Sequence, residues 1–119
     1  MNQDNNLFPI KSEWSDNLDF AITITDVDNN IVYMNNVSKK TFPTSVIGDN
    51  LDACHSQNSN DIIASLIKNK ASNTYSVQKN NITKLIHQTP WYINDEVAGL
   101  VEVSIVLPDN MQHHNRTKL

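Results

Sequence analysis

The 119-residue sequence has a single cysteine, Cys54, few glycines and no long hydrophobic run. One cysteine excludes an internal disulfide, which a small secreted domain often needs. Two glycines and four prolines are too few for a collagen-like or Gly/Pro-rich disordered chain. The longest mostly apolar stretch, residues 97–107, contains Glu102 and Ser104 and is shorter than the ~20 residues of a membrane helix. We therefore expect no membrane partner.

Basic residues are also scarce, because nine Lys and Arg stand against thirteen Asp and Glu, for a formal net charge of −4. Proteins that bind nucleic acids neutralise phosphates with clustered basic side chains, so we expect no nucleic-acid partner. Residues 1–6 lack the basic start and apolar run of a secretory signal, which predicts a cytoplasmic protein.

The pattern that is present begins with a β-hairpin over residues 20–34. Its two hydrophobic segments flank residues 26–30, which are rich in the Asp and Asn that tight turns favour. Asn35 or Asn36 then caps a short helix that Pro43 ends.

A longer helix is predicted to begin at residues 58–61, which resemble a capping box. Its apolar stripe consists of Ile62, Ile63, Leu66 and Ile67. Strands follow at residues 74–79, 82–92 and 97–107. This order predicts an α+β fold with an antiparallel sheet, of which the few helices cover one face.

The predicted boundaries are a flexible N-terminal segment with a short helical cap (residues 1–17), one domain (residues 18–108) and a polar C-terminal tail (residues 109–119). Trp14 is expected to pack on the domain or on a partner chain. No output domain is expected after the last strand, so a signal would pass to another protein.

Three motifs in this order resemble the PAS domain, a sensory and protein-interaction module. Residues 26–35 (DVDNNIVYMN) resemble the first PAS hairpin and the Asn that starts its first helix. Residues 46–48 (VIG) resemble the step before the central helices, and residues 99–103 (GLVEV) the start of the last strand. Residues 51–56 (LDACHS) are similar to a bacterial subgroup with a Cys-His-Pro-Pro stretch, although Ser56 and Gln57 replace its prolines.

The resemblance implies a PAS-like five-stranded antiparallel sheet with helices packed on one face, and a pocket between the sheet and the helix at residues 59–70. PAS domains use such pockets for haem, flavin or small metabolites, and they commonly form dimers. The residues expected to line the pocket are Ile63, Ile67, Leu85, His87 and Val103. For His87, an outward-facing imidazole on a half-wet sheet is the alternative.

Cys54 and His55 allow a second interpretation, in which His55 ligates haem or Cys54 is a redox-sensitive thiol. The alternative is a small buried Cys54 beside a loop-holding His55. Haem-binding PAS domains typically take their histidine from the long helix, and residues 59–70 contain none. Cys54 is also displaced from the flavin-adduct position of the light-sensing branch, so flavin is not expected.

Two further pairs carry weaker signals. His113 and His114 lie in the tail without a third and fourth ligand, so no metal site is expected. Trp91 and Tyr92 either stack on a planar ligand or serve packing and a dimer surface.

The sequence contains no phosphate-binding loop and no hydrolase or zinc-protease motif, so an enzyme is not expected. The leading hypothesis is a sensor module that binds a small molecule or a protein partner, as a homodimer. The alternatives are a haem- or thiol-based sensor through His55 or Cys54, a small enzyme of the ketosteroid-isomerase kind with a buried Asp or Tyr facing its cavity, and a dimerisation unit with a packed core.

Overall fold

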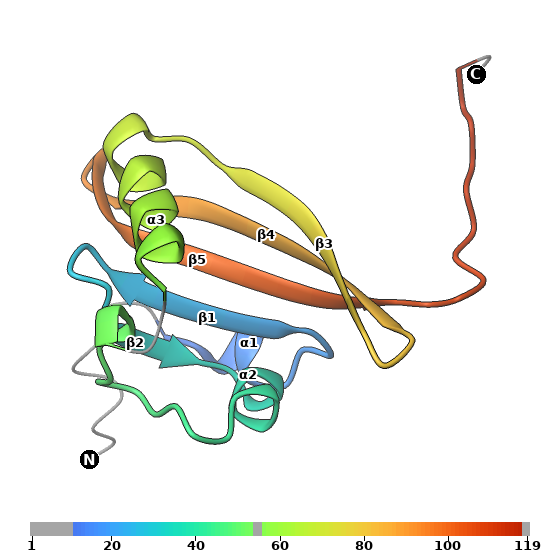
Figure 1. Ribbon diagram of the computed structural model, residues 1–119, viewed down its shortest axis with the longest axis horizontal. Helices are drawn as coiled ribbons and strands as arrows, with labels where there is room; N and C mark the ends of the chain where they lie inside the picture. Colours follow the sequence, from blue (N-terminus) through green and yellow to red (C-terminus); the bar gives the residue numbers. More distant parts are fainter. Residues whose placement is uncertain (1–10, 54–55, 118–119) are drawn as a thin grey trace.

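The computed structural model describes residues 11–53 and 56–117. Its central feature is one five-stranded antiparallel sheet in the order β2-β1-β5-β4-β3 (Figure 1). The strands are β1 (Ala21–Asp26), β2 (Ile31–Met34), β3 (Asn73–Lys79), β4 (Ile82–Ile93) and β5 (Glu96–Leu107). The helices are α1 (Glu13–Asp16), α2 (Asn36–Thr41), the 3-10 turn η2 (Leu51–Ala53) and α3 (Gln57–Asn69). The predicted α+β class and sheet are confirmed.

The β1–β2 turn is held by the side chain of Asp26. Its Oδ1 accepts hydrogen bonds from the backbone N–H of Asp28 and of Asn30, both at 2.9 Å. Asn29 adopts a left-handed conformation with φ of 67°, which Asn tolerates better than most residues. The turn residues therefore close the hairpin predicted from the sequence.

Asn35 caps α2 and joins three segments of the chain. Its Oδ1 accepts from the backbone N–H of Ser38 and of Ile22, both at 3.0 Å. Its Nδ2 donates to the backbone oxygens of Phe20 and Ser15, at 2.8 and 3.1 Å. Asn35 is 1% exposed, so these bonds satisfy an amide that would otherwise be costly to bury.

Helix α3 begins slightly before the predicted capping box, because the side chain of Ser56 caps it by accepting from the N–H of Ser59. Ile63 and Leu66 are buried against Leu100 of β5. Ile67 packs partly against this cluster, whereas Ile62 is 40% exposed. The buried stripe therefore includes three of the four predicted residues and leaves out Ile62.

A second apolar cluster lies on the other face of the sheet, because neighbouring strand residues point to opposite sides. It contains Ile22, Ile24, Val32 and Tyr33, with Leu18, Phe20, Trp91, Val101 and Val103 packed against it. We call the face of the sheet that carries Ile22, Ile24, Val101 and Val103 the outer face, and the face that carries Leu100 the helix face.

The short helix α1 contacts this outer cluster. The Tyr33 hydroxyl donates to Asp16 Oδ1 at 2.7 Å and lies 2.9 Å from Ser15 Oγ. Trp14 of the same helix is 69% exposed. It therefore does not pack on the domain, which was the first of its two expected positions.

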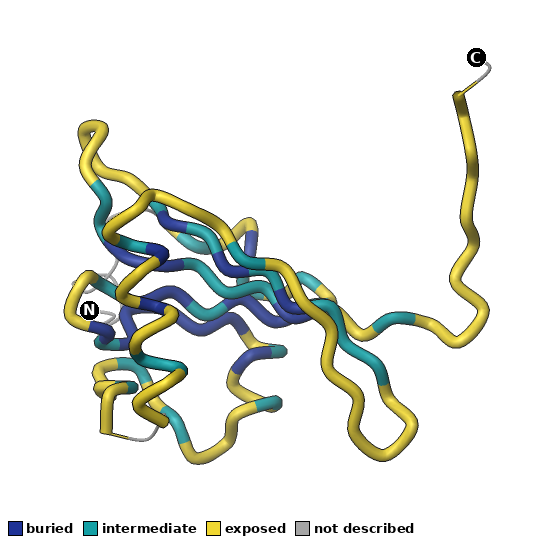
Figure 2. The backbone as a smooth tube through the Cα atoms, turned by 45° about the horizontal axis from the view of Figure 1, so that its top comes forward, coloured by how far each residue is buried: buried dark blue, intermediate teal, exposed yellow. Residues whose placement is uncertain are grey.

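Burial is concentrated in the centre of the sheet, as the dark segments of Figure 2 show. The β3–β4 hairpin tip and residues 108–117 are exposed, and residues 108–117 contain no helix or strand. Within the described ranges, no helix combines the length and the apolar character needed to cross a membrane.

Candidate functional site

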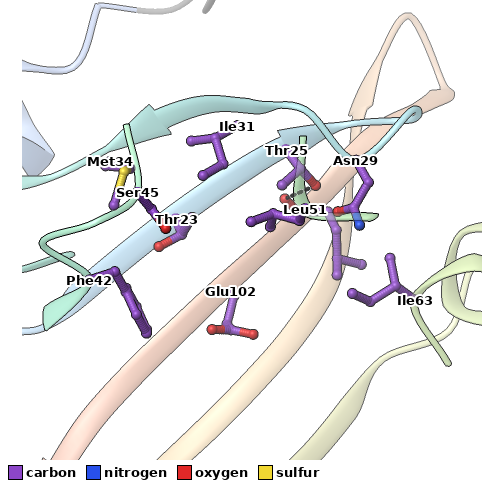
Figure 3. A pocket seen from close by; sticks show the side chains of 11 residues that line it. Thr23, Thr25, Asn29, Ile31, Met34, Phe42, Ser45, Leu51, Ile63 and Glu102 are labelled. Carbon is purple, nitrogen blue, oxygen red and sulfur yellow. Dashed lines mark hydrogen bonds between the residues drawn. The ribbon is translucent and has the colours of Figure 1, made fainter. Parts of the chain in front are cut away.

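The helix face of the sheet encloses a cavity of about 120 Å³. Asn29 and Ile63 lie at one end of it, and Phe42 and Ser45 at the other (Figure 3). The described residues that line it are Thr23, Thr25, Asn29, Ile31, Met34, Phe42, Ser45, Leu51, Ile63, Leu100 and Glu102. Strands β1, β2 and β5 thus form one wall, and η2, α3 and the segment after α2 form the other.

Most of the cavity wall is apolar, and its polar groups are few. Thr23 Oγ1 lies 2.6 Å from Ser38 Oγ of α2, and Thr25 Oγ1 lies 3.5 Å from the backbone oxygen of Leu100. Glu102 extends from β5 into the space between Phe42 and Ile63 (Figure 3). An apolar pocket with a small number of placed polar groups is the usual composition of a ligand site.

The Glu102 carboxylate accepts a hydrogen bond from Gln88 Nε2 at 2.9 Å. Within the part of the chain that the structure describes, it forms no ion pair with a basic side chain. Burial raises the pKa of Tyr75 on β3, and the negative charge of Glu102 raises it further. Glu102 therefore places on the helix face a carboxylate that has no basic partner among the described residues.

Asn29 is the buried polar residue at the end of the cavity, and the residue as a whole is 5% exposed. Its Nδ2 donates to Asp52 Oδ1 of η2 at 2.9 Å. Its Oδ1 is buried and has no hydrogen-bond partner. A buried acceptor without a partner is uncommon in native proteins, because its lost hydration is not replaced.

A second, more open hollow of about 400 Å³ adjoins this end of the cavity, and we call it the mouth. Its described lining residues are Val27, Asp28, Asn29, Asn50, Asp52, Asn60, Ile63, Ala64 and Ile67. Asn29 and Ile63 line both spaces. Asn60 of α3 donates from Nδ2 to the backbone oxygen of Asp52 at 3.2 Å, and its Oδ1 is buried without a partner.

The structure brings together only part of the predicted pocket. Ile63 lines the cavity and the mouth, and Ile67 lines the mouth. The prediction was wrong for Leu85, His87 and Val103, because none of them lines either space.

The register gives the reason for this error. His87 pairs with Val103, and Val103 pairs with Ile22, so all three residues lie on the outer face. Leu85 has the same parity as His87 and shares that face. The uniformly apolar side of β5 therefore does not face α3, and the mixed side with Leu100 and Glu102 does.

Other candidate residues have different outcomes. Cys54 and His55 lie outside the described residues. His87 Nδ1 lies 2.7 Å from Thr74 Oγ1 on the outer face, as in the alternative of an outward-facing imidazole. Trp91 packs against the outer cluster and donates from Nε1 to the backbone oxygen of Thr25 at 2.9 Å, which is a packing role.

No three His, Cys, Asp or Glu side chains of the described segments could together hold a metal ion.

Sequence reasoning missed the polar residues of the site, Asn29, Asn60 and Glu102. Glu102 could have been found from the alternation of β5, because it is a charged residue on a face that also carries Leu100. Nothing local marks Asn29, since an Asn in a hairpin turn is normally explained by its backbone conformation alone.

No protein-family model and no curated protein matches this sequence. Solved structures do match. The PAS domain of histidine kinase ThkA has a TM-score of 0.62 at 16% identity, over 74% of this chain and 99% of that one. A sensory box sensor histidine kinase from Vibrio cholerae has a TM-score of 0.58 at 18% identity, over 82% of this chain and 89% of that one.

A structure of VqmA bound to DPO has a TM-score of 0.62 at 15% identity, over 77% of this chain and 54% of that one. The chain therefore spans about half of VqmA. Together these likenesses show that the chain has the PAS fold, as the motifs predicted. The subgroup with a Cys-His-Pro-Pro stretch remains a prediction.

Proposed function

We propose that this chain, which has the PAS fold, is a non-enzymatic signalling module that binds a small molecule in the cavity on the helix face. The observation that carries the proposal is an apolar cavity beside α3 with the buried, unpartnered Oδ1 of Asn29 at its end. Sensor histidine kinases among the structures of the same fold, and the complex of VqmA with DPO, support it.

The size of the cavity limits the ligand. Sites for drug-sized molecules commonly measure ~300–1,000 Å³. The cavity of this protein measures about 120 Å³, which suits a molecule of a few heavy atoms better than haem or flavin. We therefore propose a small metabolite as the ligand and assign no haem or flavin to this cavity.

Signalling would follow from a shift between two arrangements of α3, since Ile63 of α3 contacts both the cavity and the sheet. A ligand that binds one arrangement more tightly increases its population. We propose that a second protein reads this change.

We also propose that the chain forms a homodimer through the outer face. Leu85 and Ile105 pair across β4 and β5 on this face, and Ile105 is 37% exposed. Exposed Trp14 belongs to α1, which packs on the same face through Ser15 and Tyr33. A structure of VqmA, which shares the fold, is described as a dimer.

Ligand binding is tested by ligand-observed NMR with a library of small fragments, together with native mass spectrometry of the full chain. We expect fragments to bind wild type and to lose binding in Ile63→Trp, because the larger side chain fills the cavity. Ile62→Trp is the matched control, because Ile62 is next to Ile63 in the sequence, is 40% exposed and does not line the cavity.

Circular dichroism establishes that each variant is folded. If Ile63→Trp does not fold, Leu51→Trp serves as a second cavity-filling variant. If no fragment binds wild type, the proposal is wrong, and the alternative of a dimerisation unit with a packed core is favoured. Equal binding by wild type and both cavity-filling variants would place the ligand elsewhere.

A further inference from the structure

We infer that the ligand carries a positively charged ammonium group, which binds at the mouth between Asn29 and Asn60 while an apolar chain occupies the cavity. This inference rests on the proposed function and adds the chemical class of the ligand. It follows from the hydrogen-bonding capacity, the charge and the shape of the two adjoining spaces.

The orientation of both amides is fixed by Asp52. Asn29 Nδ2 donates to the Asp52 carboxylate and Asn60 Nδ2 donates to the Asp52 backbone oxygen, at 2.9 and 3.2 Å. Turning either amide would place two acceptors against each other, so the assignment of oxygen and nitrogen is determined. Both Oδ1 atoms are therefore buried acceptors without a partner, and Asn29 as a whole is only 5% exposed.

The third amide at the mouth, that of Asn50, also uses its donors within the protein. Its Nδ2 donates to the backbone oxygen of Asp28 at 3.0 Å and to Asn30 Oδ1 at 2.8 Å. Each side-chain amide nitrogen of the described mouth thus makes at least one hydrogen bond within the protein, while two buried amide oxygens make none. A ligand that satisfies these two oxygens must supply hydrogen-bond donors.

The charge of the two spaces points to the same chemistry. Asp28 and Asp52 line the mouth, and Glu102 lines the cavity. None of the lining residues in the described ranges is Lys, Arg or His. A carboxylate or phosphate on the ligand would meet acceptors and negative charge, whereas an ammonium group supplies both donors and the opposite charge.

The shape then sets the rest of the ligand. Asn29 and Ile63 line both spaces, so a molecule whose head lies at Asn29 reaches past Ile63 into the apolar cavity. Ile31 and Leu51 contribute apolar surface to the cavity wall (Figure 3), and Leu100 lines the same cavity. A short alkylammonium ion has this distribution of charge and apolar surface.

Three probes with the same alkyl chain and different head groups test the inference: pentylammonium, pentan-1-ol and pentanoate. Their dissociation constants for the full chain are measured by ligand-observed NMR titration at pH 7 and low salt. We expect pentylammonium to bind at least about fivefold more tightly than pentan-1-ol, from the worth of a charge-assisted hydrogen bond. Pentanoate should bind most weakly.

Two variants locate the head group. Asp52→Asn removes one charge and retains an oxygen that accepts from Asn29, and it should weaken pentylammonium about two- to fivefold without affecting pentan-1-ol. Asn60→Leu removes one free acceptor and should weaken pentylammonium about two- to tenfold. Asp109→Asn, beyond the far end of β5, removes the same charge as Asp52→Asn and should change nothing.

The outcomes separate this inference from the proposed function. Tighter binding of pentylammonium that depends on Asp52 and Asn60 supports both. If pentan-1-ol or pentanoate binds as tightly as pentylammonium, and Ile63→Trp abolishes that binding, the cavity binds ligands and the inference of a cationic head is overturned. If none of the probes and none of the library fragments binds, the inference and the proposed function are both overturned.

Discussion

At the scale of single residues, Tyr33 connects the N-terminal helix to the sheet. Burial, together with the hydrogen bond to Asp16 and the charge of Asp16, raises its pKa from 10.0 to about 12, while the hydrogen bond with Ser15 opposes the shift. The protonated hydroxyl that donates to Asp16 is therefore part of the folded state. Its loss at high pH would remove the hydrogen bond that Tyr33 donates to Asp16 of α1.

Linkage gives the sign of the resulting pH dependence. Between about pH 10 and about pH 12, the native state retains a proton that the unfolded state has lost, so the free energy of unfolding falls as pH rises. The shift corresponds to about 2.7 kcal/mol at full value, and solvent screening reduces the expected contribution of Tyr33 to about 1–2 kcal/mol of this fall, complete above pH 12. Urea denaturation at a series of pH values measures it, and Tyr33→Phe should be less stable at pH 8 but lose less stability on the way to pH 12. An equal loss in both proteins would contradict the assignment to Tyr33.

Single residues also show where the sequence was informative about the site. Asn35 was predicted as one of two possible caps because an Asn before a helix is a strong local signal. Asn29 is also an asparagine, and its left-handed turn conformation is enough to explain an Asn at this position. Its burial and its contact with Asp52 depend on η2 lying across the hairpin, 23 residues further along the chain. That contact is tertiary, and no local pattern predicts it.

At the scale of elements, the close contact between β1 and β5 depends on Gly99. A Cβ added at Gly99 would lie 1.8 Å from the backbone oxygen of Thr25, and φ is +156°. Gly48 has φ of +102° but open space around it. We expect Gly99→Ala to lower the free energy of unfolding by about 3 kcal/mol or more, because the strands must separate, and Gly48→Ala by only about 1–2 kcal/mol of backbone strain.

Chemical denaturation of the two alanine variants makes this comparison directly. The Thr25 oxygen that the new Cβ would contact also accepts from Trp91 Nε1, so Gly99→Ala should change the tryptophan fluorescence of the folded protein as well. Similar stability losses in the two variants would show that backbone conformation, and not strand contact, determines the need for glycine at both positions.

The elements themselves were predicted well, because alternation, turns and caps are local. The face that each strand presents to α3 was not predicted correctly. The alternation of β5 separates its residues into two sets, but it does not say which set faces the helix. The more apolar set with Val101 and Val103 packs against Ile22 and Ile24 on the outer face. Leu18, Phe20 and Tyr33 complete that second cluster, which the expectation of helices packed on one face does not include.

At the scale of the whole molecule, the outer face continues past this cluster to the far end of β5. Ile105 lies there and is 37% exposed, next to Leu85 in the register. Val106 follows it in the sequence, is 59% exposed and points to the helix face. Because the two residues are adjacent and similar in size, they provide a matched pair for the proposed dimer surface.

We expect Ile105→Lys to weaken the homodimer and Val106→Lys to leave it intact, since only the first places a charge in the proposed interface. Sedimentation-equilibrium measurements on the full chain at several concentrations give the dissociation constant of each protein. Burying an unpaired lysine in a dimer should raise that constant at least about tenfold. A monomeric wild type, or a dimer weakened only by Val106→Lys, would contradict the proposed surface. In the second case the copies would associate through the helix face at the far end of β5.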